Sequence, residues 1–197
     1  NLKNLSSGIK NLKNLRDLSL SKNQLSKLPN ELQNLTKLTD IHLHTNNFKV
    51  FPEVLYSIKS LIHICIYRNK IKYIPKEIRE LKNLELLNAH ENIIKDLPIE
   101  LFELKNLKTL IISDNQIALI PKEINQLKNL ESLFAFNNKL EILPQELFDL
   151  YKLKELYLYG NQLKYIPKEI GYLTQINFLS LGDNNILDVL PDEICNL

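Results

Sequence analysis

The feature that most restricts the fold of this chain is a pattern that returns every 23 residues. Residues 107–129, LKTLIISDNQIALIPKEINQLKN, contain one copy, and the general form is L-x-x-L-x-L-x-x-N-x-I-x-x-I-P-x-x-I-x-x-L-x-x. A unit this short cannot bury its own apolar side chains, so neighbouring units must stack on one another. The period therefore predicts an elongated solenoid.

Full copies of the pattern follow a partial copy in residues 1–14. They start at Leu15, Leu38, Leu61, Leu84, Leu107, Leu130, Leu153 and Ile176. No linker rich in Pro, Gly or Ser interrupts them, so we predict one domain that covers residues 1–197.

The first part of each repeat alternates between apolar and other residues, as a β-strand with one buried face does. The first, fourth and sixth places are apolar and are predicted to point inward. In the repeat that starts at Leu107, we expect Thr109, Ile111 and Ser113 to point outward. Eight repeats predict about eight parallel strands with one displayed face.

The repeat, with its LPxEI-like segment, resembles the leucine-rich-repeat superfamily over the whole chain, and most of all its bacterial, spirochaete-like members. The resemblance implies an α/β fold, a horseshoe-shaped solenoid with a concave parallel sheet and with short helices or 3₁₀ turns on the convex side. It also implies a non-catalytic module that binds proteins.

The ninth place is asparagine in every full repeat. The column consists of Asn23, Asn46, Asn69, Asn92, Asn115, Asn138, Asn161 and Asn184. An inward amide can both donate to and accept from backbone groups that lose their partners where a strand ends. We interpret the column as a structural asparagine ladder, as the resemblance implies, and not as a ligand site.

All eight prolines also occupy one place in the repeat. They are Pro29, Pro52, Pro75, Pro98, Pro121, Pro144, Pro167 and Pro191. Proline is tolerated in the first turn of a helix, so we predict that each begins a short helix or 3₁₀ turn on the convex side. The last repeat has one extra residue between Asn184 and Pro191, which predicts a bulge near Leu187 to Val189.

The outward places of the strands identify a candidate binding surface. Its predicted residues are Phe134, Phe136, Tyr157, Tyr159, Phe178, Tyr67, Arg68, His42, His44, His63 and His90. Displayed aromatic side chains are common anchors in protein recognition. The alternative is that neighbouring rings, such as Phe134 and Tyr157 or Phe136 and Tyr159, only stabilise the sheet by packing on each other.

The histidines and one cysteine allow a second hypothesis. His42, His44, His63 and Cys65 lie on two adjacent predicted strands, and these residue types could hold Zn²⁺ or form a thiol nucleophile with its base. A smooth strand offers no oxyanion donors and no deep cleft. We therefore predict no enzymatic activity, no cofactor and no bound metal, and keep a metal-binding or thiol-dependent enzyme as the alternative.

Composition narrows the choice of partners. The net charge is +2, from 25 basic and 23 acidic residues, so we expect no nucleic acid partner. No apolar run is long enough to span a membrane. The predicted partner is a protein, either a host or envelope protein of a bacterial system or the partner of an intracellular signalling scaffold. The compartment stays open between secreted or surface-associated and cytoplasmic.

The two ends of the repeat array lead to a separate expectation. Residues such as Leu2, Leu5 and Leu12 match core places of later repeats, and no atypical capping sequence is recognised at either end. Terminal repeats of solenoids usually have a polar outer face. We expect apolar ends and, as a result, end-to-end self-association.

Overall fold

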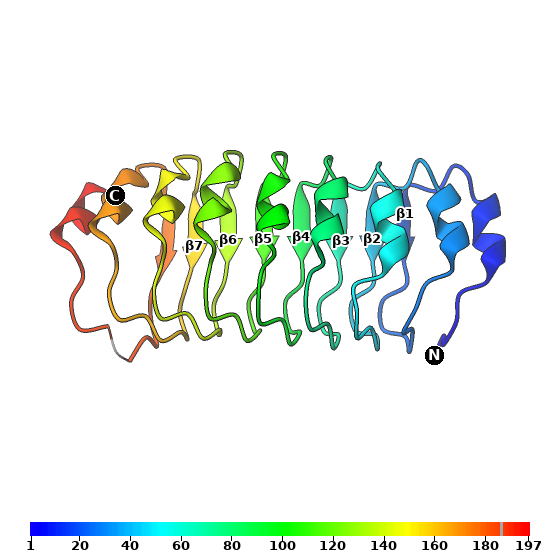
Figure 1. The fold of residues 1–197 in the computed structure, drawn as a ribbon, viewed down its shortest axis with the longest axis horizontal. Coiled ribbons are helices and arrows are strands. Elements are labelled where there is room, and N and C mark those ends of the chain that lie inside the picture. The colour runs from blue at the N-terminus through cyan, green and yellow to red at the C-terminus, as the bar shows by residue number, and fades with distance from the viewer. Residues whose placement is uncertain (186) are drawn as a thin grey trace.

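A computed structural model of the chain describes residues 1–185 and 187–197. Eight parallel strands form one open sheet in the order of the sequence, and the repeats stack side by side along the molecule (Figure 1). The strands are β1 (Asp17–Ser19), β2 (Asp40–His42), β3 (His63–Cys65), β4 (Leu86–Asn88), β5 (Thr109–Ile111), β6 (Ser132–Phe134), β7 (Glu155–Tyr157) and β8 (Phe178–Ser180). The predicted repeat solenoid with a parallel sheet is confirmed.

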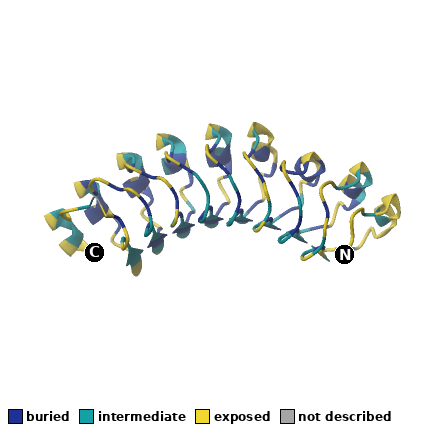
Figure 2. Cartoon of the chain, turned by 90° about the horizontal axis from the view of Figure 1, so that it is seen from below, coloured by how far each residue is buried: buried dark blue, intermediate teal, exposed yellow. Residues whose placement is uncertain are grey.

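Short 3₁₀ helices form the opposite side of the molecule. They are η1 (Ser7–Asn11), η2 (Asn30–Asn34), η3 (Glu53–Ser57), η4 (Lys76–Glu80), η5 (Ile99–Glu103), η6 (Lys122–Gln126), η7 (Gln145–Asp149), η8 (Lys168–Tyr172) and η9 (Asp192–Asn196). Seen from below, the repeats follow an arc with the strands on the inner side and the 3₁₀ helices outside (Figure 2). None of the described helices is long and apolar enough to cross a bilayer.

The strands pair without any stagger between repeats. Asp17 pairs with Asp40, and Asp40 pairs with His63, so equal places of neighbouring repeats lie side by side. The middle residues of β2 to β7 are fully buried, for example Leu110 and Leu133. Because side chains alternate along a strand, the residues on either side of each middle residue face the concave surface.

The asparagine column forms a ladder of hydrogen bonds between repeats. The Nδ2 of Asn138 donates to the carbonyl oxygens of Ile112, Ala135 and Phe136 at 3.0, 3.2 and 3.2 Å. Its Oδ1 accepts from the backbone N–H of Ile117 at 3.0 Å. Each such amide joins its own repeat to the preceding one and satisfies backbone groups that the short strands leave unpaired.

Each proline lies immediately before its 3₁₀ helix, whereas we predicted that it would be the first residue of that helix. Each precedes its 3₁₀ helix, as Pro121 precedes η6, and has an extended ψ angle. Its carbonyl oxygen accepts the first turn's hydrogen bond, which Ile124 donates to Pro121 at 3.1 Å. Proline suits this place because it needs no N–H there and its ring fixes φ before the chain turns.

The last repeat carries its extra residue between Asn184 and Pro191. The N–H of Leu187 donates to the carbonyl oxygen of Asn184 at 2.9 Å. Leu187 packs against the core, whereas Val189 is 76% exposed. The chain thus departs from the repeat around the predicted bulge, and Ile186 lies outside the described residues.

Candidate functional site

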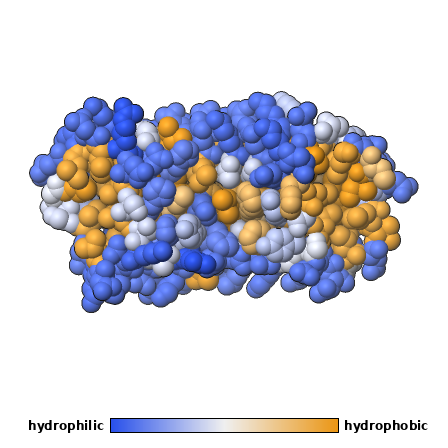
Figure 3. All heavy atoms as spheres, turned by 180° about the vertical axis from the view of Figure 1, so that it is seen from behind, coloured by the Kyte–Doolittle hydropathy of each residue, from blue (hydrophilic) through white to orange (hydrophobic). Residues whose placement is uncertain are grey.

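The concave face of the sheet carries the side chains that the sequence places outward. Hydrophilic residues border this face above and below, and apolar residues gather along its middle and at its two ends (Figure 3). All the predicted binding residues retain some exposure to solvent, and Phe178 is 46% exposed. The structure therefore brings the predicted residues onto one open surface.

Five rings on β6 to β8 and the turns after them form what we call the aromatic cluster, consisting of Phe134, Phe136, Tyr157, Tyr159 and Phe178. Phe134 stacks on Tyr157 and Phe136 stacks on Tyr159, each with ring centroids 4.5 Å apart. Tyr157 also stacks on Phe178 at 4.4 Å. The lateral packing named as the alternative interpretation is therefore present, and it holds each ring in place.

A row of rings continues from this cluster toward the N-terminal repeats. His90 lies 5.9 Å from Phe136 and 6.3 Å from Tyr67, and Tyr67 stacks on His44 at 4.2 Å between ring centroids. The contact between His90 and Phe136 spans the repeat between them, whose residue at this place is Ser113.

Ser113 lies at an outward place of its repeat, as predicted, but it is buried. The residue has no exposed surface, and its Oγ lies 3.0 Å from Nδ1 of His90. Its place in the repeat does face outward, but the serine side chain is short and the larger rings of the repeats on either side meet above it. An outward place therefore becomes buried.

Over β2 and β3 the displayed side chains form polar pairs. Asp40 is hydrogen-bonded to Nδ1 of His63 and accepts from Oγ1 of Thr39 at 2.6 Å. Burial by itself raises the pKa of Asp40, but the hydrogen bonds from Thr39 and His63 outweigh it, so the carboxyl pKa is lowered. Nε2 of His42 lies 3.8 Å from Oδ1 of Asp17.

A second polar group follows at the turns after β3 to β5. Arg68 donates to both carboxylate oxygens of Glu91, at 2.7 and 3.1 Å, and Glu91 also lies 2.9 Å from Nε2 of His90. The hydrogen bond from Arg68 lowers the pKa of Glu91. Nδ1 of His90 lies 3.3 Å from Oδ2 of Asp114. These charges are satisfied by one another.

These turns also contain a conformation that we did not predict. The eighth residue of each repeat has a positive φ, between 47° and 56° in Lys22, Thr45, Arg68, Glu91, Asp114, Asn137 and Asp183. Only Gly160 is a glycine, and its φ is 65°. Left-handed backbone is unfavourable for residues with a Cβ, above all for a β-branched residue such as Thr45.

The histidine and cysteine hypothesis gains no support from the geometry. His63 is paired with Asp40, and His44 is stacked on Tyr67. Burial raises the pKa of the Cys65 thiol, with a contribution from Asp40, which disfavours the thiolate needed by a nucleophile or a ligand. Among the described residues, no three His, Cys, Asp or Glu side chains are arranged to hold a metal ion.

Comparisons with known proteins agree with this geometry. The profile of the Leucine Rich Repeat family matches residues 14–35, 106–127, 152–173 and 175–197. A leucine-rich-repeat protein of Leptospira interrogans is 41% identical and superposes with a TM-score of 0.93 over 94% of this chain and 47% of its own. The chain is a leucine-rich-repeat protein.

Other solved structures share the fold at lower identity. An internalin of Listeria monocytogenes is 27% identical with a TM-score of 0.77, over 89% of this chain and 50% of its own. A plant peptide hormone receptor in complex with RGF2 is 26% identical with a TM-score of 0.70, over 99% of this chain and 40% of its own. This chain spans half or less of each of these proteins. Among curated proteins, none matches it significantly.

A second apolar surface of this leucine-rich-repeat protein was missed in the sequence. It lies on the flank between the strands and the 3₁₀ helices, at the thirteenth place of the repeat. Its residues are 42–53% exposed, and they are Val50, Tyr73, Leu119, Ile142 and Tyr165. Asp96 takes this place in the fourth repeat. The signal was present as a column of residues two places before the prolines, apolar or aromatic except at Lys27 and Asp96.

Proposed function

We propose that this chain is a non-catalytic module that binds a protein partner through its concave face, with the aromatic cluster as the main anchor. Leucine-rich-repeat proteins are typically protein-interaction modules. The observation that carries the proposal is that five stacked rings remain accessible on a face that no other layer covers within the part of the chain that the structure describes. Exposed clusters of this kind mark interaction sites.

The stacking makes the rings better anchors. Each ring is already held by its neighbour, so little side-chain freedom is lost when a partner covers it. The charged residues over β2 to β4 are already paired within the chain, so a partner must break or share those interactions. We therefore assign the larger share of the binding energy to the aromatic cluster.

The similarity to a Leptospira protein favours a bacterial setting, and within it we propose a host or envelope protein as the partner. A partner in intracellular signalling is the alternative. The plant receptor of the same fold, which is in complex with RGF2, supports binding of a polypeptide by such an array.

The test uses a displayed library of fragments from host extracellular proteins and bacterial envelope proteins. Binders selected on the wild-type chain are measured against Tyr157→Ala with Tyr159→Ala, and against His42→Ala with His44→Ala. We expect the tyrosine variant to lose about 30-fold in affinity, since anchors contribute ~2 kcal/mol or more, and the histidine variant to lose less. Circular dichroism checks that both variants fold.

A normal affinity of the tyrosine variant together with a weak histidine variant would place the site over the N-terminal strands and contradict the proposal. Binders whose affinity falls only when the flank residues Leu119 and Ile142 are changed to Ser would move the site off the concave face. Turnover that is lost with Cys65→Ser would instead support the thiol enzyme.

We also propose end-to-end association of this 197-residue chain. Leu2 and Leu12 are 48% and 50% exposed at one end, and Leu190 is 43% exposed at the other. Light scattering over a range of concentrations measures it, with Leu2→Glu and Leu12→Glu as the variant expected to be monomeric. A wild-type chain that stays monomeric at high concentration contradicts this proposal.

A further inference from the structure

A pocket on the convex flank lies where η3 and η4 begin, away from the concave face. It has a volume of about 480 Å³ and opens between the second and third repeats. Val50 and Tyr73, both about half exposed, form its apolar edge, and Phe51 and Pro75 contribute to its walls. It is thus large enough for the end of a side chain or a small organic molecule.

Tyr56, one of the residues that line the pocket, has a buried hydroxyl group without a hydrogen-bond partner among the described residues. Tyr56 is only 7% exposed, and its ring stacks on Phe51 with centroids 5.6 Å apart. Its Oη is the one buried side-chain polar atom without a hydrogen-bond partner among the described residues. Leaving such a group unpaired is unfavourable, so a hydroxyl here calls for a reason other than packing.

Other repeats show that packing alone does not require the hydroxyl. Phe102 and Phe148 occupy the same place as Tyr56 two and four repeats further along, and both are buried. A phenyl ring therefore fills this place in the wall of 3₁₀ helices. Tyr56 differs from these phenylalanines only by its hydroxyl oxygen. A ligand that forms a hydrogen bond to this oxygen would explain its presence.

The charged residues around the pocket indicate the charge of the ligand that it can bind. Of the residues that the structure describes, Glu53 and Glu77 line it, and no Lys, Arg or His does. Burial raises the pKa of Tyr56 above its ordinary value, and the nearby carboxylates of Glu77 and Glu53 raise it further. The pocket therefore combines negative potential with an apolar edge and an aromatic ring, Tyr73, that can face a cation.

We propose that this pocket binds an organic cation, an ammonium or guanidinium group carried on an apolar stem. The cation donates hydrogen bonds to Oη of Tyr56 and to the carboxylates of Glu53 and Glu77, and its stem packs against Val50 and Tyr73. Its source is either a lysine or arginine side chain of a protein or a free organic amine.

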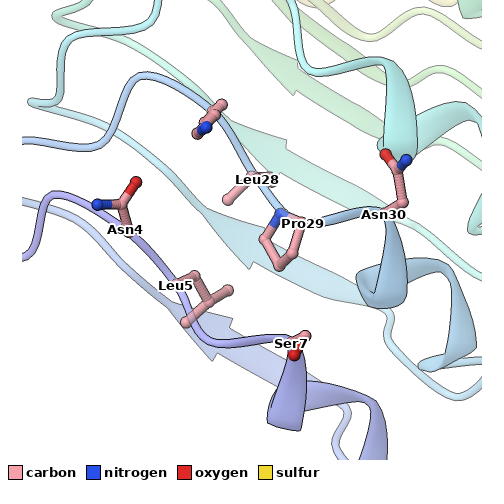
Figure 4. A pocket seen from close by; sticks show the side chains of 7 residues that line it. Asn4, Leu5, Ser7, Leu28, Pro29 and Asn30 are labelled. Carbon is pink, nitrogen blue, oxygen red and sulfur yellow. The ribbon is translucent and has the colours of Figure 1, made fainter.

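A neighbouring hollow serves as a contrast. It has about 400 Å³, lies between the partial repeat and the first full repeat, and is lined by Asn4, Ser7 and Asn30 together with Leu5, Leu28 and Pro29 (Figure 4). Lys27 also lines it, and no carboxylate does. It has neither the unpaired buried group nor the negative charge, so we expect no cation to bind there.

The first experiment titrates the chain with benzylammonium, with benzyl alcohol as the neutral match and benzoate as the anionic match. Ligand-observed NMR measures binding, and the chemical shifts of labelled tyrosines locate it. We expect benzylammonium to bind about tenfold or more tightly than benzyl alcohol, and benzoate not to bind. Equal binding of the cation and the alcohol would overturn the proposal.

Two variants test the residues. Tyr56→Phe should weaken benzylammonium binding about five- to tenfold, yet leave the urea midpoint of the free chain unchanged or higher, because an unpaired buried group is removed. Glu77→Gln should also weaken binding, whereas its matched control Glu123→Gln, at the same place two repeats later, should not. Unchanged binding by Tyr56→Phe, or a clear fall in its urea midpoint, contradicts the proposal.

The source of the cation is tested with a short Gly/Ser peptide that contains one arginine, compared with its citrulline counterpart. If the arginine peptide binds and Tyr56→Phe weakens it, the pocket is a subsite for a protein side chain. If benzylammonium binds and the peptide does not, the pocket is a site for a free amine. If neither cation binds, no such site exists, and the proposal for the concave face is unaffected.

Discussion

The concave face presents charged side chains over β1 to β4 and aromatic rings over β6 to β8, although the backbone beneath them is the same. In the first region the charges already have partners, such as His63 for Asp40 and Glu91 for Arg68. In the second region the rings have stacked neighbours but keep apolar surface in contact with water, as Phe178 does.

This difference shows how a repeat scaffold separates stability from recognition. The ladder and the core hold both regions in the same way, so the displayed places are free to differ in chemistry. A polar region whose charges satisfy each other gains little from a new partner, whereas exposed apolar surface gains free energy when it is covered.

The largest expected effect tests whether the two regions share one scaffold. Asn92→Ala in the first region and Asn138→Ala in the second each remove an amide that makes four hydrogen bonds to the backbone. We expect both to lower the free energy of unfolding by about 3 kcal/mol, because buried backbone groups lose their partners. Urea denaturation measures the change.

The control for the ladder is Lys122→Ala on the exposed 3₁₀ helix η6, which should change the free energy of unfolding by less than about 0.5 kcal/mol. A clear difference between the two asparagine variants would show that the scaffold is not uniform. The interpretation of the two regions as differing only in display would then fail.

A double-mutant cycle compares the pairs that characterise each region. Phe134 and Tyr157 should show a coupling free energy of about 1 kcal/mol that does not change with salt, because stacked rings carry no net charge. The coupling between Arg68 and Glu91 should be smaller and should fall as salt is added, because the two side chains are 58% and 38% exposed and solvent screens their charges. A salt-sensitive ring pair would contradict this assignment.

The left-handed place of the turn offers a smaller effect. Thr45→Gly in the first region should raise the free energy of unfolding by about 1 kcal/mol, since a β-branched residue is unfavourable at a φ of 56°. Asn137→Gly in the second region should change it little, because asparagine tolerates this conformation and donates to Asp114 at 3.0 Å. Thermal denaturation compares them, and a destabilised Thr45→Gly would show that the threonine side chain matters more than the strain.

The smallest effect concerns pH and only the first region. Burial, with positive charges nearby, lowers the pKa of His44 below 6.5, so the folded state favours the neutral ring. The contribution of His44 to stability is therefore present above pH 6.5 and is lost as the pH falls below it. The urea midpoint of His44→Phe, which keeps a ring against Tyr67, should fall less than that of the wild type between pH 7.5 and 5. Equal pH profiles would contradict the role of His44.

The 23-residue period by itself determined the architecture. Each place in the repeat has one direction relative to the strand, so the core leucines, the asparagine ladder, the concave residues and the lateral ring pairs all followed from position. The pairing of Phe134 with Tyr157 was predictable because neighbouring strands pair without stagger. The apolar flank column was also present in the sequence, at one place of the repeat, and was overlooked.

Only the tertiary structure decided what happens between side chains at those places. The burial of Ser113 depends on the size of His90 and Phe136 in the repeats on either side, and the left-handed turns depend on how the chain leaves each strand. The unpaired hydroxyl of Tyr56 depends on every group that surrounds it in three dimensions. A repeat place sets where a side chain points, whereas its exposure and its partners are set by neighbours whose identities differ from repeat to repeat.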